Sequence, residues 1–371
     1  MPETPQQSSS AIAFPVVGIG ASAGGLDALS RFFSAMPGDM GVGFVVISHL
    51  DPSHDSMLSE LLDRRTALKV REAEDKIRLQ PDCVHIIPPD HFLTVEDGVL
   101  HLSEPLGRRG TRMPIDHFFR SLAEDRQDKA ICIILSGAGS DGTLGLRAIK
   151  ALGGLAMVQA PETAQHDGMP RSALNTGMVD YVLPVEQMPE VLRRYVDHPY
   201  VKSDDDPQPL GGSETNHLQR ILALLHTRSG HDFRCYKKNT LLRRIQRRMS
   251  LHRVENLEDY LPILREHPDE INALVKDLLI SVTSFFRDPE AWEILGKEVI
   301  PTLLRERFSN SPLRIWIPGC ASGEEAYSLA ILILEHMERA QAHMALQIFA
   351  TDIDQAALEV ARNGVYPENI T

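Results

Sequence analysis

Short apolar runs, bounded by glycines and polar residues, dominate the first half of the chain. Residues 16–20, 43–48 and 130–135 are such runs, and their length and Val/Ile content predict buried strands. Each run leads into a turn and then into a segment of mixed polarity. This alternation predicts an α/β domain built on a parallel, doubly wound sheet.

The pattern changes in the second half, where apolar residues recur at helical spacing. Residues 218–225 and 240–251 are the clearest amphipathic segments, and 256–267 and 270–280 continue the run. The sequence therefore predicts a small all-helical domain after the α/β domain.

The segment 240–251 also carries a cluster of arginines. Its apolar residues share one side of the predicted helix, and charged residues cover the rest. Two interpretations remain open: a solvated helix face, or a docking face for an acidic partner helix. The arginines are Arg243, Arg244, Arg247 and Arg248.

Two more apolar runs, 313–317 and 346–350, follow the helical segments. A glycine-containing loop and a helical segment lie between them, and Asp352 comes directly after the second run. Strand, loop, helix, strand and acid in this order predict the start of a Rossmann-like sheet. Two glutamates at the start of the helix disfavour a phosphate, so a nucleoside without phosphate is the better fit.

Composition supplies the expected domain boundaries. Prolines, glycines and an acidic run between 201 and 216 indicate a linker. We expect a flexible tail at 1–13, the α/β domain at 14–197, the linker at 198–215, the helical domain at 216–290 and a partial Rossmann-like domain at 291–371.

Charge and cysteine content narrow the class of protein. The net charge of −13 argues against nonspecific binding of nucleic acid, and the four cysteines have neither metal nor disulfide spacing. No apolar run reaches the roughly 18 residues of a membrane helix, and the first residues are too polar for a signal peptide. These features indicate a cytoplasmic protein without membrane insertion or a metal site.

Ser22 is the first candidate for chemistry. It lies in the glycine-rich turn GASAGG directly after the first predicted strand. Such a turn can expose a nucleophile or hold a nucleotide phosphate. The glycines read GxGxxxG rather than GxGxxG, and the second strand ends at His49 rather than at a carboxylate. The nucleophile is therefore the favoured interpretation.

His49 and Asp141 are placed like Ser22, each after an apolar strand. The carboxyl ends of parallel strands meet at one edge of a sheet, where catalytic groups gather. A serine, a histidine and an aspartate at that edge suggest a nucleophile, a base and an orienting group. His54 and His166 are rival bases. The chain order differs from that of α/β-hydrolases, which also carry GxSxG.

These residues belong to longer motifs that resemble the catalytic domain of chemotaxis protein-glutamate methylesterases. The motifs are GIGASAGG, the strand ending in His49, LSGAGSDG and ETAQHDGMPRSAL, within residues 14–195. The resemblance implies that Ser22 is the nucleophile, His49 the base and Asp141 the orienting carboxylate. The implied reaction hydrolyses glutamate γ-methyl esters on receptor helices and releases methanol, without a cofactor. Related enzymes also deamidate glutamine.

The chain departs from that family's pattern at two positions. Ala23 stands where threonine is common, and Ala138 stands where methionine is common. Main-chain N–H donors survive both changes, so we expect the oxyanion to bind near Ala23 and in the loop 137–139. Met169 and Arg171 are either substrate contacts or packing residues.

The second half resembles chemotaxis protein-glutamate O-methyltransferases. The matching motifs are SVTSFFRDPEAW, WIPGCASGEEAYSLA and IFATDIDQAALEVARNGVY, within residues 216–371. The resemblance implies S-adenosylmethionine as cofactor. The implied contacts are Thr283 and Arg287 lining the cofactor, Gly319 and Gly323 allowing close approach, Glu324 on its amino-acid part and Asp352 on its ribose. The alternative is a surface ion pair for Arg287 and a helix-terminal charge for Glu324.

Two function classes follow from these resemblances. The first is an enzyme that joins a methylesterase to a glutamate methyltransferase; the second is a signalling scaffold that binds receptor helices without turnover. An open methyltransferase sheet needs more than two strands. We therefore expect the methyltransferase part to be truncated and inactive in this chain.

Overall fold

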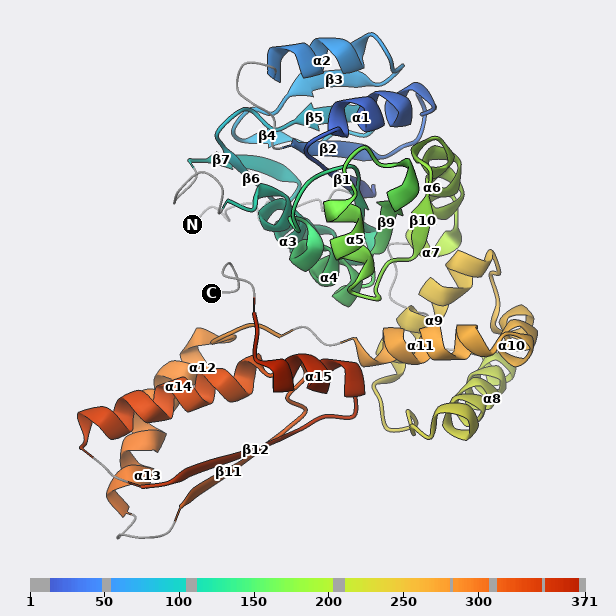
Figure 1. Ribbon diagram of the computed structural model, residues 1–371. Coiled ribbons are helices and arrows are strands. Elements are labelled where there is room, and N and C mark those ends of the chain that lie inside the picture. Colours follow the sequence, from blue (N-terminus) through green and yellow to red (C-terminus); the bar gives the residue numbers. More distant parts are fainter. Residues whose placement is uncertain are drawn as a thin grey trace, which may run out of the picture. The chain divides into compact units, whose positions relative to one another are not determined.

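The chain forms two compact units, Met1–Ile280 and Ser281–Thr371 (Figure 1). The computed structural model describes residues 14–48, 55–104, 112–202, 211–280, 283–306, 312–341 and 344–366. The first unit contains a sheet domain and a bundle of helices, and the second contains a strand pair with helices.

A seven-stranded parallel sheet forms the centre of the first unit (Figure 1). Strand β1 lies in the middle, between β8 and β2, so the segments that follow these three strands meet at one edge. The predicted parallel α/β fold is confirmed. In sheet order the strands are β10 (Tyr181–Leu183), β9 (Leu155–Gln159), β8 (Ala130–Ile134), β1 (Val16–Ala21), β2 (Gly43–Ser48), β5 (Cys83–Ile86) and β3 (Lys69–Glu72).

Helices cover both faces of this sheet. On one face, Phe32 and Phe33 pack edge-on against Phe44 of β2, with ring centroids 6.5 and 5.7 Å away. On the other face, Phe118 and Phe119 are buried with side chains of the neighbouring strands. The helices are α1 (Gly25–Ser34), α2 (Asp55–Asp63), α3 (Pro114–Arg126), α4 (Thr143–Ala151), α5 (Gly168–Leu174), α6 (Met188–Val196) and α7 (Pro199–Lys202), with short 3₁₀ turns at Gln127–Lys129, Pro161–Thr163 and Val185–Gln187.

Gly18 and Gly20 lie inside β1, not in a loop. A Cβ on Gly18 would lie 2.8 Å from Phe119, and one on Gly20 would lie 2.6 Å from Ile115. The missing side chains let α3 approach the strand closely. Packing therefore explains these glycines, which removes them as an argument for a phosphate site.

A small antiparallel sheet lies beside α3. It has the order β4-β7-β6, and Ser121 of α3 accepts a hydrogen bond from Val95 N at 3.1 Å. Its strands are β4 (Ile77–Arg78), β6 (Phe92–Glu96) and β7 (Val99–Ser103).

The remainder of the first unit is the predicted all-helical domain. Its apolar residues, including Phe233 and Tyr260, form a core of their own. The Asn256 side chain accepts a hydrogen bond from Asp259 N at 2.8 Å and so caps its helix. The helices are α8 (Gly212–Ser229), α9 (Lys238–His252), α10 (Leu257–Glu266) and α11 (Pro268–Leu279).

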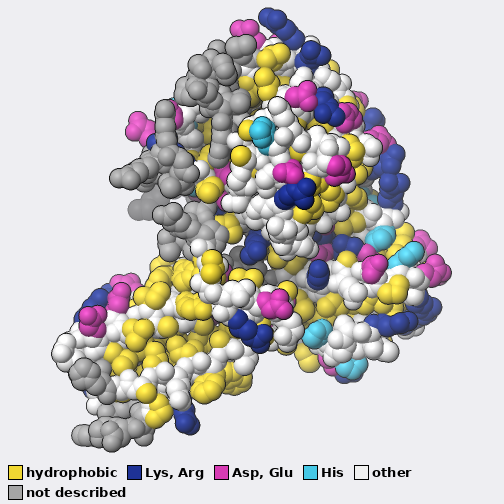
Figure 2. Space-filling view, viewed as in Figure 1, with side chains coloured by type: hydrophobic (Ala, Val, Ile, Leu, Met, Phe, Trp, Pro, Cys, Tyr) yellow, Lys and Arg dark blue, Asp and Glu magenta, His cyan; other side chains and the backbone are white. Residues whose placement is uncertain are grey.

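The second unit is built on two parallel strands. A small core of Ile300, Leu313, Ile333 and Met337 joins them to the helices. Figure 2 shows hydrophobic side chains gathered on the surface of this unit. Its elements are α12 (Pro289–Ile294), a π-helical turn (Leu295–Val299), α13 (Ile300–Glu306), β11 (Leu313–Pro318), α14 (Glu324–Arg339), β12 (Leu346–Thr351) and α15 (Gln355–Asn363).

The described residues contain neither a membrane-spanning helix nor a cluster of metal-binding side chains. None of the helices described has the length and apolar character needed to cross a membrane. Within the same segments, no group of three or more His, Cys, Asp or Glu side chains is placed to hold a metal ion. The cysteines Cys83, Cys132, Cys235 and Cys320 are free thiols.

Candidate functional site

Ser22 lies directly after β1, at the turn that opens α1. Its main-chain N–H donates to Ser136 O at 3.0 Å, and its carbonyl accepts from Gly25 N at 2.8 Å. Gly24 has a φ of 72°, which favours glycine, and a Cβ there would lie 2.7 Å from Ser136 Oγ. The turn therefore holds Ser22 at the carboxyl edge of the sheet, half-buried, at the amino end of a helix.

Ser136, which follows the neighbouring strand, holds the turn at Ser22. Its side chain, which is 1% exposed, donates to Ala23 O at 2.9 Å and accepts from His166 N at 3.0 Å. Gln159, also buried, accepts from Ser136 N at 2.8 Å and donates to Thr163 O at 3.0 Å. The segments after β1, β8 and β9 are thus tied together.

The sequence interpretation missed both Ser136 and Gln159. The available signal was a polar side chain at the end of an apolar strand, as in the run LAMVQ. A buried amide at that position needs hydrogen-bond partners, and the nearest ones are main-chain groups of adjacent loops.

Asp141 is 2% exposed and lies at the amino ends of two helices. Its carboxylate accepts from the main-chain N–H groups of Ile115, Asp116 and Gly142, at 3.0, 2.8 and 2.9 Å. Ile115 in turn packs against Gly20 of β1. The carboxylate is therefore fixed next to the strand that ends at Ser22.

His49 and its rival His54 lie outside the described residues. The strand before His49 is described, and its last residue, Ser48, pairs with Ala21 of β1. The residues that come next in the two segments are His49 and Ser22. The role of His49 remains a prediction from the sequence.

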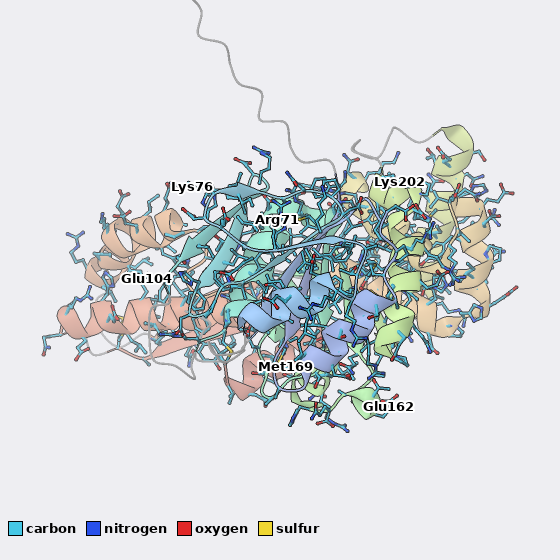
Figure 3. All side chains as sticks on the ribbon, turned by 90° about the horizontal axis from the view of Figure 1, so that it is seen from above. Arg71, Lys76, Glu104, Glu162, Met169 and Lys202 are labelled. Carbon is cyan, nitrogen blue, oxygen red and sulfur yellow. The ribbon has the colours of Figure 1, made fainter. Side chains whose placement is uncertain are left out.

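The other candidates near Ser22 are placed by the structure. His166 has its main chain bound to Ser136 and its side chain exposed. Met169, marked in Figure 3, is fully buried, and a Cβ on Gly137 would lie 2.1 Å from its sulfur. Arg171 is exposed and pairs with Asp167 at 2.5 Å. The structure thus favours packing for Met169.

Two main-chain amides remain available beside Ser22. The N–H of Gly137 is already bound to His166 O at 3.0 Å. Among the described residues, the amides of Ala23 and Gly24 have no hydrogen-bond acceptor, and they lie at the amino end of α1. Such amides suit an oxyanion, because the helix dipole adds to their partial positive charge.

Four of the predicted cofactor residues lie in or contact one loop, and these are Gly319, Gly323, Glu324 and Asp352. Asp352 accepts from Ala321 N at 2.7 Å and from Asp354 N at 2.8 Å, so it holds the loop between β11 and α14. Glu324, 5% exposed, accepts from Ser322 Oγ at 2.9 and 2.7 Å. These carboxylates face the same loop from its two sides.

The glycines of that loop have left-handed backbones. Gly319 has a φ of 74° with open space where a Cβ would be, and Gly323 has a φ of 98°. Thr283 is half-buried and Arg287 is exposed, on a segment held to α14 by the bond from Phe286 N to Ser328 Oγ. A loop that contacts two carboxylates and has open space at Gly319 is suited to the hydroxyl and amino groups of a nucleoside ligand.

Comparison with known families assigns each part of the chain. Residues 17–192 match the family described as CheB methylesterase. Residues 216–279 match the all-alpha domain of CheR methyltransferase, and residues 281–371 match the SAM-binding domain of CheR methyltransferase.

Individual relatives agree with these families. A putative protein-glutamate methylesterase/protein-glutamine glutaminase of Leptospira interrogans is 37% identical over 183 residues, which is 49% of this chain and 94% of that protein. The enzyme of that name from Geobacillus kaustophilus is 37% identical over 178 residues, 47% of this chain and 51% of that protein.

Two further matches differ in kind. An uncharacterized 104.1 kDa protein in the hypE 3' region of Rhodobacter capsulatus is 39% identical over 333 residues, 84% of this chain, which spans 35% of that protein. The crystal structure of the Thermotoga maritima CheB methylesterase catalytic domain aligns with a TM-score of 0.47 at 32% identity, over 49% of this chain and 98% of that one.

The recognition of two joined families from the sequence motifs is confirmed. The chain belongs to the CheB methylesterase family, and it joins that domain to the all-alpha and SAM-binding domains of CheR methyltransferases.

Proposed function

We propose that the first unit hydrolyses glutamate γ-methyl esters on signalling proteins, as a serine hydrolase with Ser22 as nucleophile. The observation that carries the proposal is the turn at Ser22. It is held by Ser136 at the start of α1, beside the loop in which Asp141 is fixed by three main-chain amides. A free serine hydroxyl is a weak nucleophile, so this turn needs a base and an oxyanion site.

The reaction assigns each group a proton or a charge. His49 takes the proton of Ser22 Oγ while that oxygen attacks the γ-carbonyl carbon of the ester. The amides of Ala23 and Gly24 receive the oxyanion, each donor contributing roughly 10²–10³-fold. His49 then returns the proton to the departing methoxide, which leaves as methanol. Asp141 holds the imidazole in the required tautomer.

A water molecule completes the cycle. His49 takes a proton from the water, whose oxygen attacks the acyl carbon bound to Ser22. The tetrahedral intermediate collapses, and His49 returns the proton to Ser22 Oγ. An unesterified glutamate side chain remains on the partner. The same steps with ammonia as leaving group convert glutamine into glutamate, so deamidation is included in the proposal. The partner is a methylated helix of a chemoreceptor-type protein.

The second unit supplies the proposed methyltransferase portion. S-adenosylmethionine would carry the methyl group, and the residues present suit its polar parts. Asp352 would accept hydrogen bonds from the ribose, and Glu324 would bind the amino group of the amino-acid part. Gly319 and Gly323 would let the main chain of the loop approach the cofactor closely. Thr283 and Arg287 would line the cofactor. The contacts of Asp352 and Glu324 with the loop between β11 and α14 support these roles.

Replacement of Ser22 by alanine tests the hydrolase directly. With a methyl-labelled receptor as substrate, we expect methanol release to fall about 10³-fold or more. The matched control is Ser140→Ala, which removes an exposed serine from the loop after β8. Retention of most activity in Ser22→Ala would exclude Ser22 as nucleophile. If the unaltered chain bound the receptor and released no methanol, the protein would be a signalling scaffold instead.

A further inference from the structure

Helix α9 carries the arginine cluster, and most of that cluster faces the sheet domain of the same unit. Arg243 donates to Asp128 at 2.9 Å. Arg244 donates to the carbonyls of Lys150, at 3.0 Å, and Ala151, which are the last carbonyls of α4. Guanidinium groups commonly bind carbonyls at the ends of helices.

Arg247 is the centre of the contact and is fully buried. Its Nε donates to the carbonyls of Gly153 and Gly154, both at 3.1 Å, in the turn between α4 and β9. Its two terminal nitrogens donate to Asp180 and to Asp277, each at 2.5 Å. A buried guanidinium with this many acceptors is held in one orientation.

The buried charges balance across the contact. Lys150 Nζ lies 2.7 Å from Asp180 and 3.7 Å from Asp277. Lys150 and Asp180 come from the sheet domain, while Arg247 and Asp277 come from the helical domain. Each domain therefore contributes one cation and one carboxylate. Burial would raise the pKa of Asp180, but the charges of Arg247 and Lys150 outweigh it and lower that pKa to about 2.

Some apolar packing accompanies these charges, because Leu251 of α9 packs against the core of the sheet domain. Beyond the arginines, Tyr181 Oη donates to Leu251 O at 3.4 Å, and the His198 ring contacts Val254 O at 3.2 Å. The buried apolar residues of the helical domain form a cluster separate from those of the sheet domain. Polar interfaces of this kind join domains that each keep their own core.

The contact lies at the edge of the sheet opposite the candidate site. Asp128, Asp180 and the turn 151–154 all precede strands, whereas Ser22 and Ser136 follow strands. Strands of five residues separate the two edges by about 17 Å. Figure 3 labels Met169 and Glu162 on one side of the unit and Lys202, at the end of α7, on the other. The helical domain thus leaves the site open.

We propose that α9 is an intramolecular anchor, which fixes the helical domain to the amino edge of the sheet and makes residues 14–280 one cooperative unit without controlling the esterase site. The amino edge of the sheet is therefore covered by α9, a helix of the same chain. The arginine cluster is then neither a solvated face nor a docking face for another protein. Only the activity arm of the following test rests on the proposed function.

The anchor is tested by hydrogen exchange of the full chain, under conditions in which the core amides exchange through global unfolding. We expect peptides of the helical domain and peptides of β1 and β8 to exchange together in the unaltered protein. In Arg247→Met, one buried carboxylate loses its counter-charge. Peptides of the helical domain should then exchange about 10²–10³-fold faster than in the unaltered protein, and they should exchange independently of the sheet peptides. The kcat and KM for methanol release should stay within about twofold.

Second variants separate the anchor from a local folding defect. Asp180→Asn added to Arg247→Met restores charge balance, so the double variant should be more protected than the sum of the single effects predicts. Arg234, also in the helical domain, is exposed and pairs with Asp232 at 2.9 Å, outside this network. Arg234→Gln should therefore combine additively with Asp180→Asn.

Two results would overturn the anchor. Independent exchange of helical and sheet peptides in the unaltered chain would show that the contact does not hold in solution. A fall in kcat of about tenfold or more in Arg247→Met, with the sheet peptides still protected, would show that the contact controls the site. Absence of esterase activity in the unaltered chain would count against the proposed function and leave the exchange results intact.

Discussion

Replacement of Ser136 by alanine probes how the proposed nucleophile, Ser22, is held. The change removes the hydroxyl that donates to Ala23 O at 2.9 Å and accepts from His166 N at 3.0 Å. Two part-buried hydrogen bonds are lost, at about 0.5–1.5 kcal/mol each, so the free energy of unfolding should fall by about 1–3 kcal/mol. For a unit of this size, the melting temperature should drop by about 2–12 °C.

The same change should slow the reaction. The turn at Ser22 loses its side-chain bond to the next strand, so the position of Ser22 is less well fixed, although its hydroxyl and the groups that bind the substrate are all retained. A small displacement of a reacting atom costs about 10–100-fold, so we expect kcat to fall by that factor with KM nearly unchanged.

Steady-state methanol release, measured well below the melting temperature, checks this expectation. Ser140→Ala is the matched control, since it removes an exposed hydroxyl from the same loop and should alter neither kcat nor stability. If Ser136→Ala lowered the melting temperature and left kcat unchanged, the hydroxyl would be structural only. A rise in KM at constant kcat would indicate a substrate contact instead.

Three further predictions concern the base, acid stability and the cofactor. His49→Gln should approach Ser22→Ala in its loss of methanol release and add little in the double variant, while His54→Gln should cost much less; equal losses at 49 and 54 would defeat the assignment. The charges and hydrogen bonds at Asp180 and Glu270 lower both pKa values to about 2, from 3.8 and 4.5, so the stability they contribute is present above about pH 4.5 and should be lost towards pH 2; a denaturant midpoint constant over that range would contradict this. The 371-residue chain should bind S-adenosylmethionine weakly and transfer no methyl group, because the strand pair leaves its faces exposed; micromolar binding by calorimetry, lost in Asp352→Ala, would show a competent site.

The exposure of the strand pair is the observation behind the last of these predictions. Trp316 of β11 is 67% exposed and Phe349 of β12 is 55% exposed. A ligand that binds here has to offset the ordering of a surface that the rest of the unit does not cover. Both tryptophans of the chain lie in this unit, so their fluorescence reports on it separately from the first unit.

The sheet and part of the site could be predicted from the sequence because they depend on local patterns. Apolar runs of strand length located β1, β2 and β8 along the chain, and strand ends placed Ser22 and Asp141 at one edge. Gly18 and Gly20 were less informative. A glycine in a strand signals that something approaches closely, but only the packed α3 shows that it is Phe119 and Ile115.

Ser136 and Gln159 could not be assigned from the sequence, for a related reason. Their partners are main-chain atoms of Ala23, Thr163 and His166, which carry no side-chain signature. The sequence shows that a polar side chain sits in an apolar setting. It does not show which loop the fold brings within hydrogen-bond distance, because that depends on strand order.

Helix α9 is the clearest case in which the partners of a side chain could not be predicted from the sequence. Its periodicity and its arginines were both recognised, yet neither of the two interpretations they left open describes the contact that the structure shows. The acceptors of Arg244 and Arg247 are mostly carbonyls at the end of α4 and in the turn after it, and the carboxylates of Asp180 and Asp277 come from two different domains. A guanidinium binds helix-end carbonyls as readily as it binds an acidic helix. In a chain that joins two domains, an arginine-rich face should therefore be tested first against the neighbouring domain, since that domain is present at high effective concentration before any partner arrives.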